Sequence, residues 1–397
     1  MPVFHYYLPG TPQPLSAASS AWEAPLPVDR HSAQFPSPEK TASDLTLGDY
    51  FTAARRFLEA NEFATLAEAV AGRRGRSALK EGLREIHITL IKHGAFYHPA
   101  LISVHGAGEV LKFVLNAAVS EPGRQTIKNE YAALERLNKT GGNAYLPAVY
   151  GRATVRTDSG RPLDMFLGDW FDGFHEFHLS RSRKTTGSPL KLRVWDEERG
   201  FFLLTKNQSL ALYRQASFIL TACYNPLTFE QIFPWHHAAG DFVLRVDSAG
   251  IATRLITVRQ YAPMFRKGEI SKDTAQQHKQ TMLGLLFYLL NLSLRMRIDR
   301  LDGTGELVLA GDEAIPPVWE GFIFGLQQNH FPWPFREDMA SAFKTYLAGI
   351  SVSELYDLAQ ATGGGFHPLA PERTLINQNL VDHVATLWTA IEQHGLD

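Results

Sequence analysis

The sequence predicts an α+β protein of two lobes, a small antiparallel-sheet lobe and then a larger helical lobe, with a helical extension before both. Three observations predict this class. Strand-like runs follow one another at 86–90, 100–104 and 109–115, the first with the strict alternation of a half-buried strand. Helical spacing of apolar residues prevails from about Leu203 onward. The 397 residues are too many for one compact core and suit two or three packed units.

Two segments precede the predicted sheet. Residues 1–45 are rich in Pro, Ser and Ala, and proline at this density disfavours a helix or a central strand, so we expect a tail or a wrapping arm. Residues 46–84 are expected to form a helical extension of two helices, one through Phe51 and Leu58 and one through Leu66.

Residues 85–173 are expected to form the small lobe. A loop over 92–99 and then a Gly-bearing turn join its first three strands, which makes an antiparallel meander. A helix over about 125–139 follows, and two further strands near 148–154 and 165–170 complete this lobe.

Residues 174–397 are expected to form the helical lobe. One strand pair, 242–246 with 255–258, interrupts its helices. The longest apolar run, 282–294, is too short to span a bilayer and predicts a buried core helix. A final helix is expected over about 380–393.

Composition limits the classes of function. The chain carries 39 basic and 41 acidic residues, and this balance removes the electrostatic case for nucleic acid or an anionic membrane surface as the main partner. The N-terminus lacks the charged and apolar regions of a signal peptide, so we expect a cytoplasmic protein. Cys223 is the sole cysteine, which excludes an intrachain disulfide and predicts a small buried hydrophobe.

Lys112 and Glu130 are both predicted to point inward. Lys112 stands in an otherwise apolar strand, where burying an ammonium group is costly without an anionic partner. Glu130 falls on the same stripe of its helix as Ile127 and Leu134. Such a pair invites an ion pair that aims the ammonium group at a bound phosphate. The alternative is that both side chains reach into water.

A second candidate lies in His236–Asp241, which follows a long helix and directly precedes the predicted strand pair. An aspartate at the end of such a loop is well placed to accept a proton from a substrate hydroxyl group. Asp241 and the neighbouring His237 are therefore candidate catalytic residues. The alternative is that Gly240 and Asp241 form a turn and that the histidines only pack or cap.

The order of these elements resembles the protein-kinase-like fold in its aminoglycoside phosphotransferase branch. Gly240 and Asp241 resemble the end of the His-Gly-Asp catalytic loop of that branch, and residues 168–173 resemble its hinge. Residues 316–322 resemble its late aromatic helix. The resemblance covers roughly residues 85–345, and short motifs carry it.

The resemblance implies that ATP binds between the two lobes, with magnesium. Lys112 would contact the α- and β-phosphates, and Glu130 would hold Lys112. The loop after the first strand would cover the phosphates through Gly94. The hinge-like residues 168–173, Asp169 among them, would line the adenine pocket.

Two positions depart from the pattern of an active member. The residue five after the catalytic Asp241 is Val246 instead of Asn, and Arg259 and Gln260 stand near the place of the second metal-binding Asp. Phosphoryl transfer needs metal to neutralise the phosphate oxygens, and Arg259 beside the phosphates would replace its charge but not its geometry. Two functions therefore stay open. One is an ATP-dependent phosphotransferase acting on a small-molecule or protein hydroxyl group, and the other is a pseudokinase that binds a nucleotide or a protein partner without transfer.

Other kinds of site find little support in the sequence. His175 and His178 bracket Glu176, but a zinc site would need a third ligand, which His236 or His237 could supply only if the fold brings the two segments together, so a metal site is disfavoured there. The chain has no Gly-x-Ser-x-Gly elbow, no Gly-x-Gly-x-x-Gly after a strand and no Walker lysine motif, which disfavours a serine hydrolase and dinucleotide or P-loop binding. The basic residues between Arg181 and Arg193 predict a solvated loop.

Overall fold

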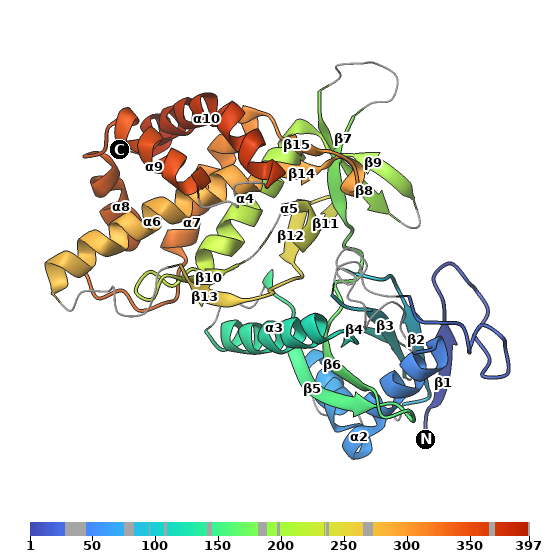
Figure 1. Cartoon of the computed structure of the whole chain (residues 1–397). Helices are drawn as coiled ribbons and strands as arrows, with labels where there is room; N and C mark the ends of the chain where they lie inside the picture. The colour runs from blue at the N-terminus through green and yellow to red at the C-terminus, as the bar shows by residue number, and fades with distance from the viewer. Residues whose placement is uncertain are drawn as a thin grey trace. The chain divides into compact units, whose positions relative to one another are not determined.

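The computed structural model of the chain divides into two compact units, residues 1–138 with 147–172 and residues 139–146 with 173–397. The first unit holds a six-stranded sheet and the second is mostly helical, so the predicted α+β class, with a sheet unit followed by a mostly helical unit, is confirmed (Figure 1). The structure describes residues 1–27, 45–74, 83–94, 96–106, 109–140, 145–181, 189–196, 199–233, 235, 238–264, 273–364 and 370–395.

The sheet of the first unit has the strand order β1-β2-β3-β4-β6-β5 (Figure 1). Strands β2 to β6 pair antiparallel, as the predicted meander requires, and helix α3 (Glu121–Lys139) lies between β4 and β5 in the chain. The strands are β1 (Val3–Tyr7), β2 (Glu85–Leu90), β3 (Ala100–His105), β4 (Val110–Ala118), β5 (Val149–Arg156) and β6 (Pro162–Asp169).

Strand β1 is an edge strand that the sequence did not predict within the N-terminal arm. It lies between Pro2 and Pro9, so its five residues contain no proline and can pair with a neighbour. It runs parallel to β2 at the edge of the sheet, where a strand needs only one partner. The expectation that the arm supplies no central strand still agrees with this edge position, and residues 28–44 of the arm lie outside the described residues.

Helix α2 (Leu47–Arg74) is the predicted helical extension, and it consists of two helical segments. They meet at a kink over 60–63, where Asn61, Glu62 and Phe63 have positive φ angles of 50°, 56° and 65°. The helix covers one face of the sheet. The core residues that it shares with the strands include Tyr50, Phe51, Phe57, Leu58, Ile86, Ile88, Phe113, Leu115, Leu163, Met165 and Leu167.

Helix α3 covers the opposite face of the same sheet. Along β6, Leu163, Met165 and Leu167 belong to the core with α2, so the alternate residues point the other way. Two of those alternate residues contact α3, since Asp164 pairs with Lys128 at 3.4 Å and Phe166 contacts the ring of Tyr131.

The second unit contains a three-stranded sheet that the sequence did not predict, β7 (Phe177–Ser180), β8 (Lys191–Asp196) and β9 (Gly200–Leu203). Each strand has only four to six residues, too few for a clear period. Two short pairs are also present, β10 (Glu230–Ile232) with β13 (Tyr261–Pro263) and β14 (Ile298–Arg300) with β15 (Leu307–Leu309).

The predicted strand pair of this unit is present, but its second strand lies earlier in the chain than expected. Strand β11 (Phe242–Asp247) pairs with β12 (Gly250–Leu255), so the expected strand at 255–258 is wrong. The turn between them is only two residues long. Gly250, the first residue of β12, has a φ of 122°, which glycine adopts easily and which allows so short a turn.

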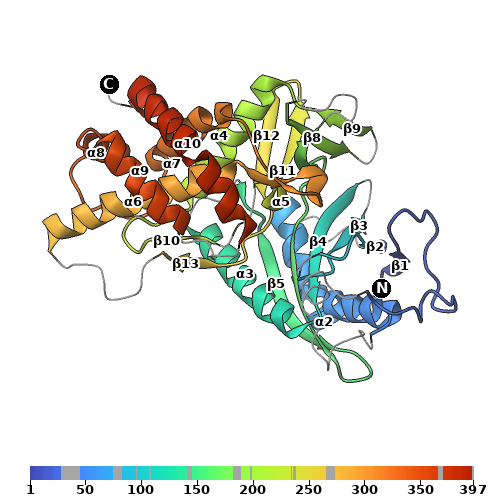
Figure 2. The same ribbon diagram turned by 45° about the horizontal axis from the view of Figure 1, so that its top comes forward.

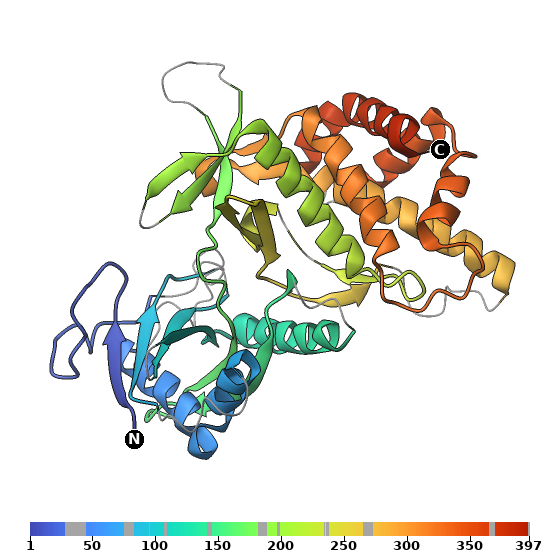
Figure 3. The same ribbon diagram turned by 180° about the vertical axis from the view of Figure 1, so that it is seen from behind.

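Helices make up the rest of the second unit (Figures 2 and 3). They are α4 (Lys206–Ala222), α5 (Ala238–Asp241), α6 (Thr274–Met296), α7 (Ile315–Gln327), α8 (Met339–Leu347), α9 (Val352–Gly364) and α10 (Pro371–Gly395), with 3₁₀ turns η3 (Leu301–Gly303) and η4 (Asp312–Ala314). The apolar run at 282–294 lies within α6 and is largely buried, which confirms a core helix. In the described part of the chain, no helix is both long and apolar enough to cross a membrane.

Helix α7 is the predicted aromatic helix, and two glycines bring it close to α4. A Cβ atom on Gly321 would overlap the carbonyl oxygen of Arg214, and one on Gly325 would overlap Thr221. The hydroxyl group of Ser217 donates to the carbonyl oxygen of Val318 across the same contact, at 2.6 Å. Figure 3 shows the two helices side by side.

Cys223 follows α4 directly and is buried, as predicted. Burial raises the pKa of its thiol to about 12, so the thiolate form is disfavoured at neutral pH.

Candidate functional site

Lys112 lies on β4, on the sheet face that α3 covers. Its neighbours Phe113 and Leu115 are buried against α2, and side chains alternate along a strand. The ammonium group pairs with the carboxylate of Asp172 at 2.7 Å, and these side chains are 36% and 67% exposed. Lys112 is therefore only half-buried, and it takes Asp172 as its partner in place of Glu130.

Glu130 is 2% exposed, so the prediction that it points inward is confirmed. It is buried on α3 with Ile127, Ala133 and Leu134, which form the apolar stripe from which it was predicted. The two predicted groups thus occupy the expected elements, but the predicted ion pair between them is wrong. The physical reason is that the end of β6 leads into a segment that brings Asp172 to the ammonium group.

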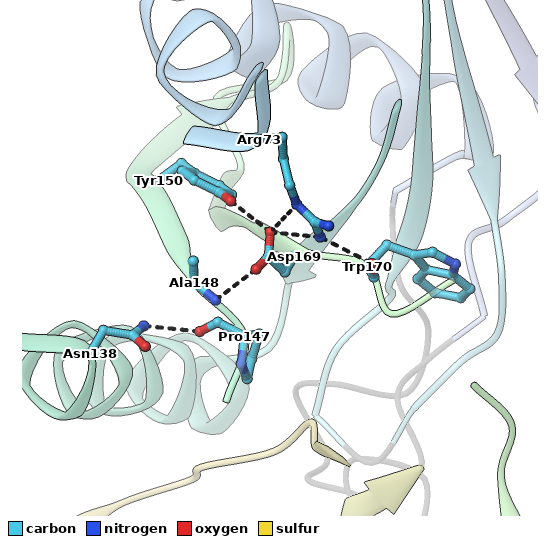
Figure 4. Close-up of polar contacts among 7 residues, drawn as sticks. All are labelled: Arg73, Asn138, Pro147, Ala148, Tyr150, Asp169 and Trp170. Carbon is cyan, nitrogen blue, oxygen red and sulfur yellow. Dashed lines mark hydrogen bonds and ion pairs between the residues drawn. The ribbon is translucent and has the colours of Figure 1, made fainter. Parts of the chain in front are cut away.

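Asp169 anchors the end of α2 to the sheet (Figure 4). One carboxylate oxygen, Oδ1, accepts hydrogen bonds from the hydroxyl group of Tyr150 at 2.6 Å and from Arg73 Nε at 3.0 Å. The other oxygen accepts from the backbone N–H of Ala148 at 3.2 Å. Burial and then the bond to Asp169 raise the pKa of Tyr150, which keeps its hydroxyl group a donor.

The carboxylate of Asp169 is thus engaged in holding α2, and the place of residues 168–173 beside an adenine pocket stays a prediction. Arg73 also donates to the carbonyl oxygen of Trp170 at 3.2 Å (Figure 4). The boundary between the two units falls between Asp172 and Gly173, at the end of the hinge-like segment. The segment was predicted from its short Gly- and Asp-bearing sequence, and it is where the chain leaves the first unit.

The loop after β2, predicted to cover the phosphates, folds into a tight turn on the sheet. Gly94 donates its N–H to the carbonyl oxygen of Tyr97 at 2.8 Å, and His98 donates its own N–H to Ala117 at 2.8 Å. His98 is fully buried, and its carbonyl oxygen accepts from Tyr50 at 2.7 Å. In this conformation the amide of Gly94 closes a turn and does not point at a ligand.

Asp241 is the last residue of the short helix α5, and β11 begins at the next residue. Its carboxylate is 1% exposed and pairs with Arg259 Nη1 at 2.8 Å, and the arginine side chain is 17% exposed. The backbone carbonyl of Asp241 accepts from Ile256 N–H at 2.9 Å. The two predicted residues Asp241 and Arg259 are thus brought together, and His237 lies outside the described residues.

The immediate start of β11 affects the expected catalytic loop. In protein kinases, the metal-binding Asn follows the catalytic Asp by five residues. The residue at that spacing from Asp241 is Val246, which lies inside β11 opposite Ile251. A valine fixed in a strand supplies no metal ligand, so Asp241 is not followed by a loop of the expected kind.

The histidines bracketing Glu176 take separate partners. His175 Nε2 lies 3.5 Å from Asp196, and His178 Nδ1 lies 3.0 Å from Asp299. Asp299 is 3% exposed and also accepts from Leu179 N–H at 2.6 Å. This buried carboxylate was missed in the sequence. Its only signal there is an acidic residue directly after a long apolar helix.

A further buried polar group of the second unit escaped sequence analysis. Arg297 Nη1 lies 2.9 Å from His383 Nδ1, and His383 Nε2 lies 3.0 Å from the hydroxyl group of Ser293. Burial and then Arg297 lower the pKa of His383 to about 3, so the imidazole stays neutral. With Nδ1 accepting from Arg297, Nε2–H donates to Ser293. An arginine stands where a catalytic triad would have a carboxylate, so this group is structural.

Comparisons with known proteins add little to this geometry. No family model and no curated protein matches the chain. It is similar to the structure of WaaP in complex with acyl carrier protein, with 10% identity and a TM-score of 0.31 over 68% of this chain and 86% of that one. It is also similar to the Cydia pomonella granulovirus kinase PK-1, with 10% identity and a TM-score of 0.24 over 83% of this chain and 99% of that one. Similarity at these TM-scores carries no argument about the fold family or the function of this chain.

Proposed function

We propose that the chain is a kinase-like protein that binds a nucleotide such as ATP and does not transfer a phosphoryl group through Asp241. The observation that carries the proposal is the buried ion pair of Asp241 with Arg259 at 2.8 Å. A catalytic base must reach the hydroxyl proton of its substrate at hydrogen-bond distance. The carboxylate of Asp241 is 1% exposed and already bonded to a guanidinium group, so in this conformation it offers a substrate hydroxyl group no access.

The residues around this pair do not fit a magnesium ion. In kinases, Mg²⁺ takes oxygen ligands from an Asp after the strand pair and from the catalytic-loop Asn. Residues 256–260 read Ile-Thr-Val-Arg-Gln and contain no carboxylate, and Val246 is a strand residue. Arg259 supplies positive charge in this segment, so we infer that nucleotide binding is independent of metal.

Lys112 is the residue that we expect to contact the nucleotide phosphates. Its ammonium group is half-exposed, and its partner Asp172 is a solvent-exposed carboxylate. An exposed ion pair is worth about 1 kcal/mol or less, so a phosphate group can displace Asp172 at small cost. The amide of Gly94 is used in the turn after β2, and the carboxylate of Asp169 is used in holding α2. Lys112 is therefore the main polar contact that we expect for the phosphates.

A phosphotransferase acting on a small-molecule or protein hydroxyl group is the second candidate. The observation that favours it is that Asp241 and Arg259, on either side of the open end of one hairpin, contact each other. If a bound phosphate drew Arg259 away, the carboxylate of Asp241 would become a base. In this function the rate of phosphoryl transfer would depend on Asp241. In the first proposal Asp241 has no catalytic role.

Thermal unfolding of the full chain with ATP, with and without Mg²⁺, separates these functions. At about a hundred times the dissociation constant, ATP should add about 2.7 kcal/mol to the free energy of unfolding. We expect this shift without Mg²⁺, its loss in Lys112→Ala and its retention in Lys191→Ala, an exposed lysine of the second unit. A shift that requires Mg²⁺ would favour the phosphotransferase, and no shift in any condition would contradict nucleotide binding.

A further inference from the structure

Three potential metal ligands gather on the first two strands of the sheet, independently of the proposed nucleotide site. They are His5 on β1 and Glu85 and His87 on β2, and one ligand atom of each lies within 4.8 Å of the other two. His5 and His87 are direct partners in the parallel pair of strands. Glu85 precedes His87 by two residues, so both point to the same face of the sheet.

The opposite face of these two strands is apolar, and its packing on the core holds the strands in place without any contribution from His5, Glu85 or His87. Tyr6 contacts the ring of Phe51 on α2, and Ile86 and Ile88 are fully buried in the core. The histidine face is instead partly open, with side chains 32% exposed for His5 and 23% for His87. Folding of the sheet therefore does not itself require two histidines and a glutamate at these positions.

Two of the three distances between the ligand atoms are near those of a tetrahedral zinc site. Glu85 Oε2 lies 3.2 Å from His87 Nε2 and 3.8 Å from His5 Nε2. Zinc bonds of 2.0–2.1 Å at the tetrahedral angle separate ligand atoms by about 3.4 Å. The ligand atoms of His5 and His87 lie within 4.8 Å of each other, so rotations of the side chains would bring both imidazoles and the carboxylate around one ion.

A fourth residue supports the ring of His87 from the next strand. His105 is the β3 partner of Glu85, and its ring packs on that of His87 with centroids 4.1 Å apart. Its Nε2 atom is buried and has no hydrogen-bond partner among the described residues. This ring contact limits the orientations that the imidazole of His87 can take.

We propose that His5, Glu85 and His87 form a binding site for a divalent transition metal ion, with Zn²⁺ the favoured ion. Two imidazoles and one carboxylate are a ligand set that zinc accepts, with the fourth position left to water. The ion would join β1 to β2 and so hold the N-terminal strand on the edge of the sheet. Glu85 and His87 alone span one strand, so it is His5 that makes the site a link between the two strands.

The test begins with the full chain stripped by a chelator and titrated with ZnCl₂ in a calorimeter. We expect one bound equivalent, and at least about tenfold weaker binding in His5→Gln and in His87→Gln. His330→Gln, an exposed histidine of the second unit, is the matched control and should bind as the parent does. Equal affinity in the parent and in both ligand variants, or no binding by the parent, would overturn the proposal.

Amide hydrogen exchange gives a second readout that ordinary surface binding does not move. Zn²⁺ should slow exchange over residues 3–7 in the parent and in His330→Gln, but not in His5→Gln. Glu85→Gln is the substitute variant if a histidine variant fails to fold, because the side chain of Glu85 is 49% exposed. It too should weaken Zn²⁺ binding. Unchanged exchange in the parent at saturating Zn²⁺ would show that the ion does not join the strands.

Discussion

The guanidinium group of Arg259 lies 2.8 Å from the carboxylate of Asp241, and the two residues flank the open end of the β11–β12 hairpin. Asp241 precedes β11 directly, and Arg259 follows the end of β12 by four residues. The carboxylate of Asp241, which is 1% exposed, is thus paired with a guanidinium group inside the second unit.

Removing the arginine should destabilise the protein more than removing the pair. Arg259→Ala leaves a buried carboxylate without its cation and should cost about 3 kcal/mol or more in the free energy of unfolding. The double variant Arg259→Met with Asp241→Leu should lose much less. Chemical denaturation of both variants checks this. Equal losses in the two would mean that packing, and not charge, decides the stability of this contact.

Asp172→Asn should strengthen nucleotide binding with little effect on stability. The variant removes the anion that competes with phosphate for Lys112, so ATP affinity should rise a few-fold. The exposed pair itself is worth about 1 kcal/mol or less. Asp158→Asn is the matched control, since Asp158 forms a similarly exposed pair with Arg56 in the same unit. Equal ATP affinity in both variants would remove Lys112 from the nucleotide site.

Gly321→Ala should destabilise the second unit by separating α7 from α4. The new methyl group would overlap the carbonyl oxygen of Arg214, and backbone on both sides must move. Overpacking of this kind costs about 1–3 kcal/mol. Gly106→Ala, where a Cβ atom meets nothing within 4 Å, is the control. Chemical denaturation should separate the two, and equal stability would contradict the close approach of the helices.

His383 should make the protein less stable as the pH falls below about 6.5. Its folded pKa of about 3 lies below the unfolded value near 6.5, so the unfolded chain binds the extra proton. The loss should reach about 2 kcal/mol between pH 7 and pH 5 and continue toward pH 3. His383→Gln, which can still accept from Arg297 and donate to Ser293, should flatten this slope, whereas His330→Gln should not. A slope unchanged in His383→Gln would assign the acid sensitivity to other groups.

The strand and helix order of the first unit could be predicted because its signals are local. Alternation over 86–90 and the stripe through Glu130 mark their elements without knowledge of the fold. The partner of Lys112 could not be predicted in this way, because Asp172 lies 60 residues away. Whether Glu130 or Asp172 contacts Lys112 depends on the path of the residues that follow β6.

Two kinds of feature were missed in the sequence. One is contact between residues that lie far apart in the chain, and the other is the short strand. The pairing of β1 with β2 joins residues about 80 positions apart, so the approach of His5 to His87 has no local signature. The strands of the sheet β7-β8-β9 are so short that the alternation of apolar and polar residues along each one gives no clear signal. The hairpin was found, but a two-residue turn moved β12 toward the N-terminus.

The most direct test of the central claim is a calorimetric titration of ATP into the full chain, first in EDTA and then in Mg²⁺. ADP should be measured in the same samples. We predict saturable binding in EDTA, similar affinity with Mg²⁺, and no ADP formed beyond that in a protein-free control. Binding only with Mg²⁺, together with ADP formation that Asp241→Asn abolishes, would contradict the account and make the chain an active phosphotransferase.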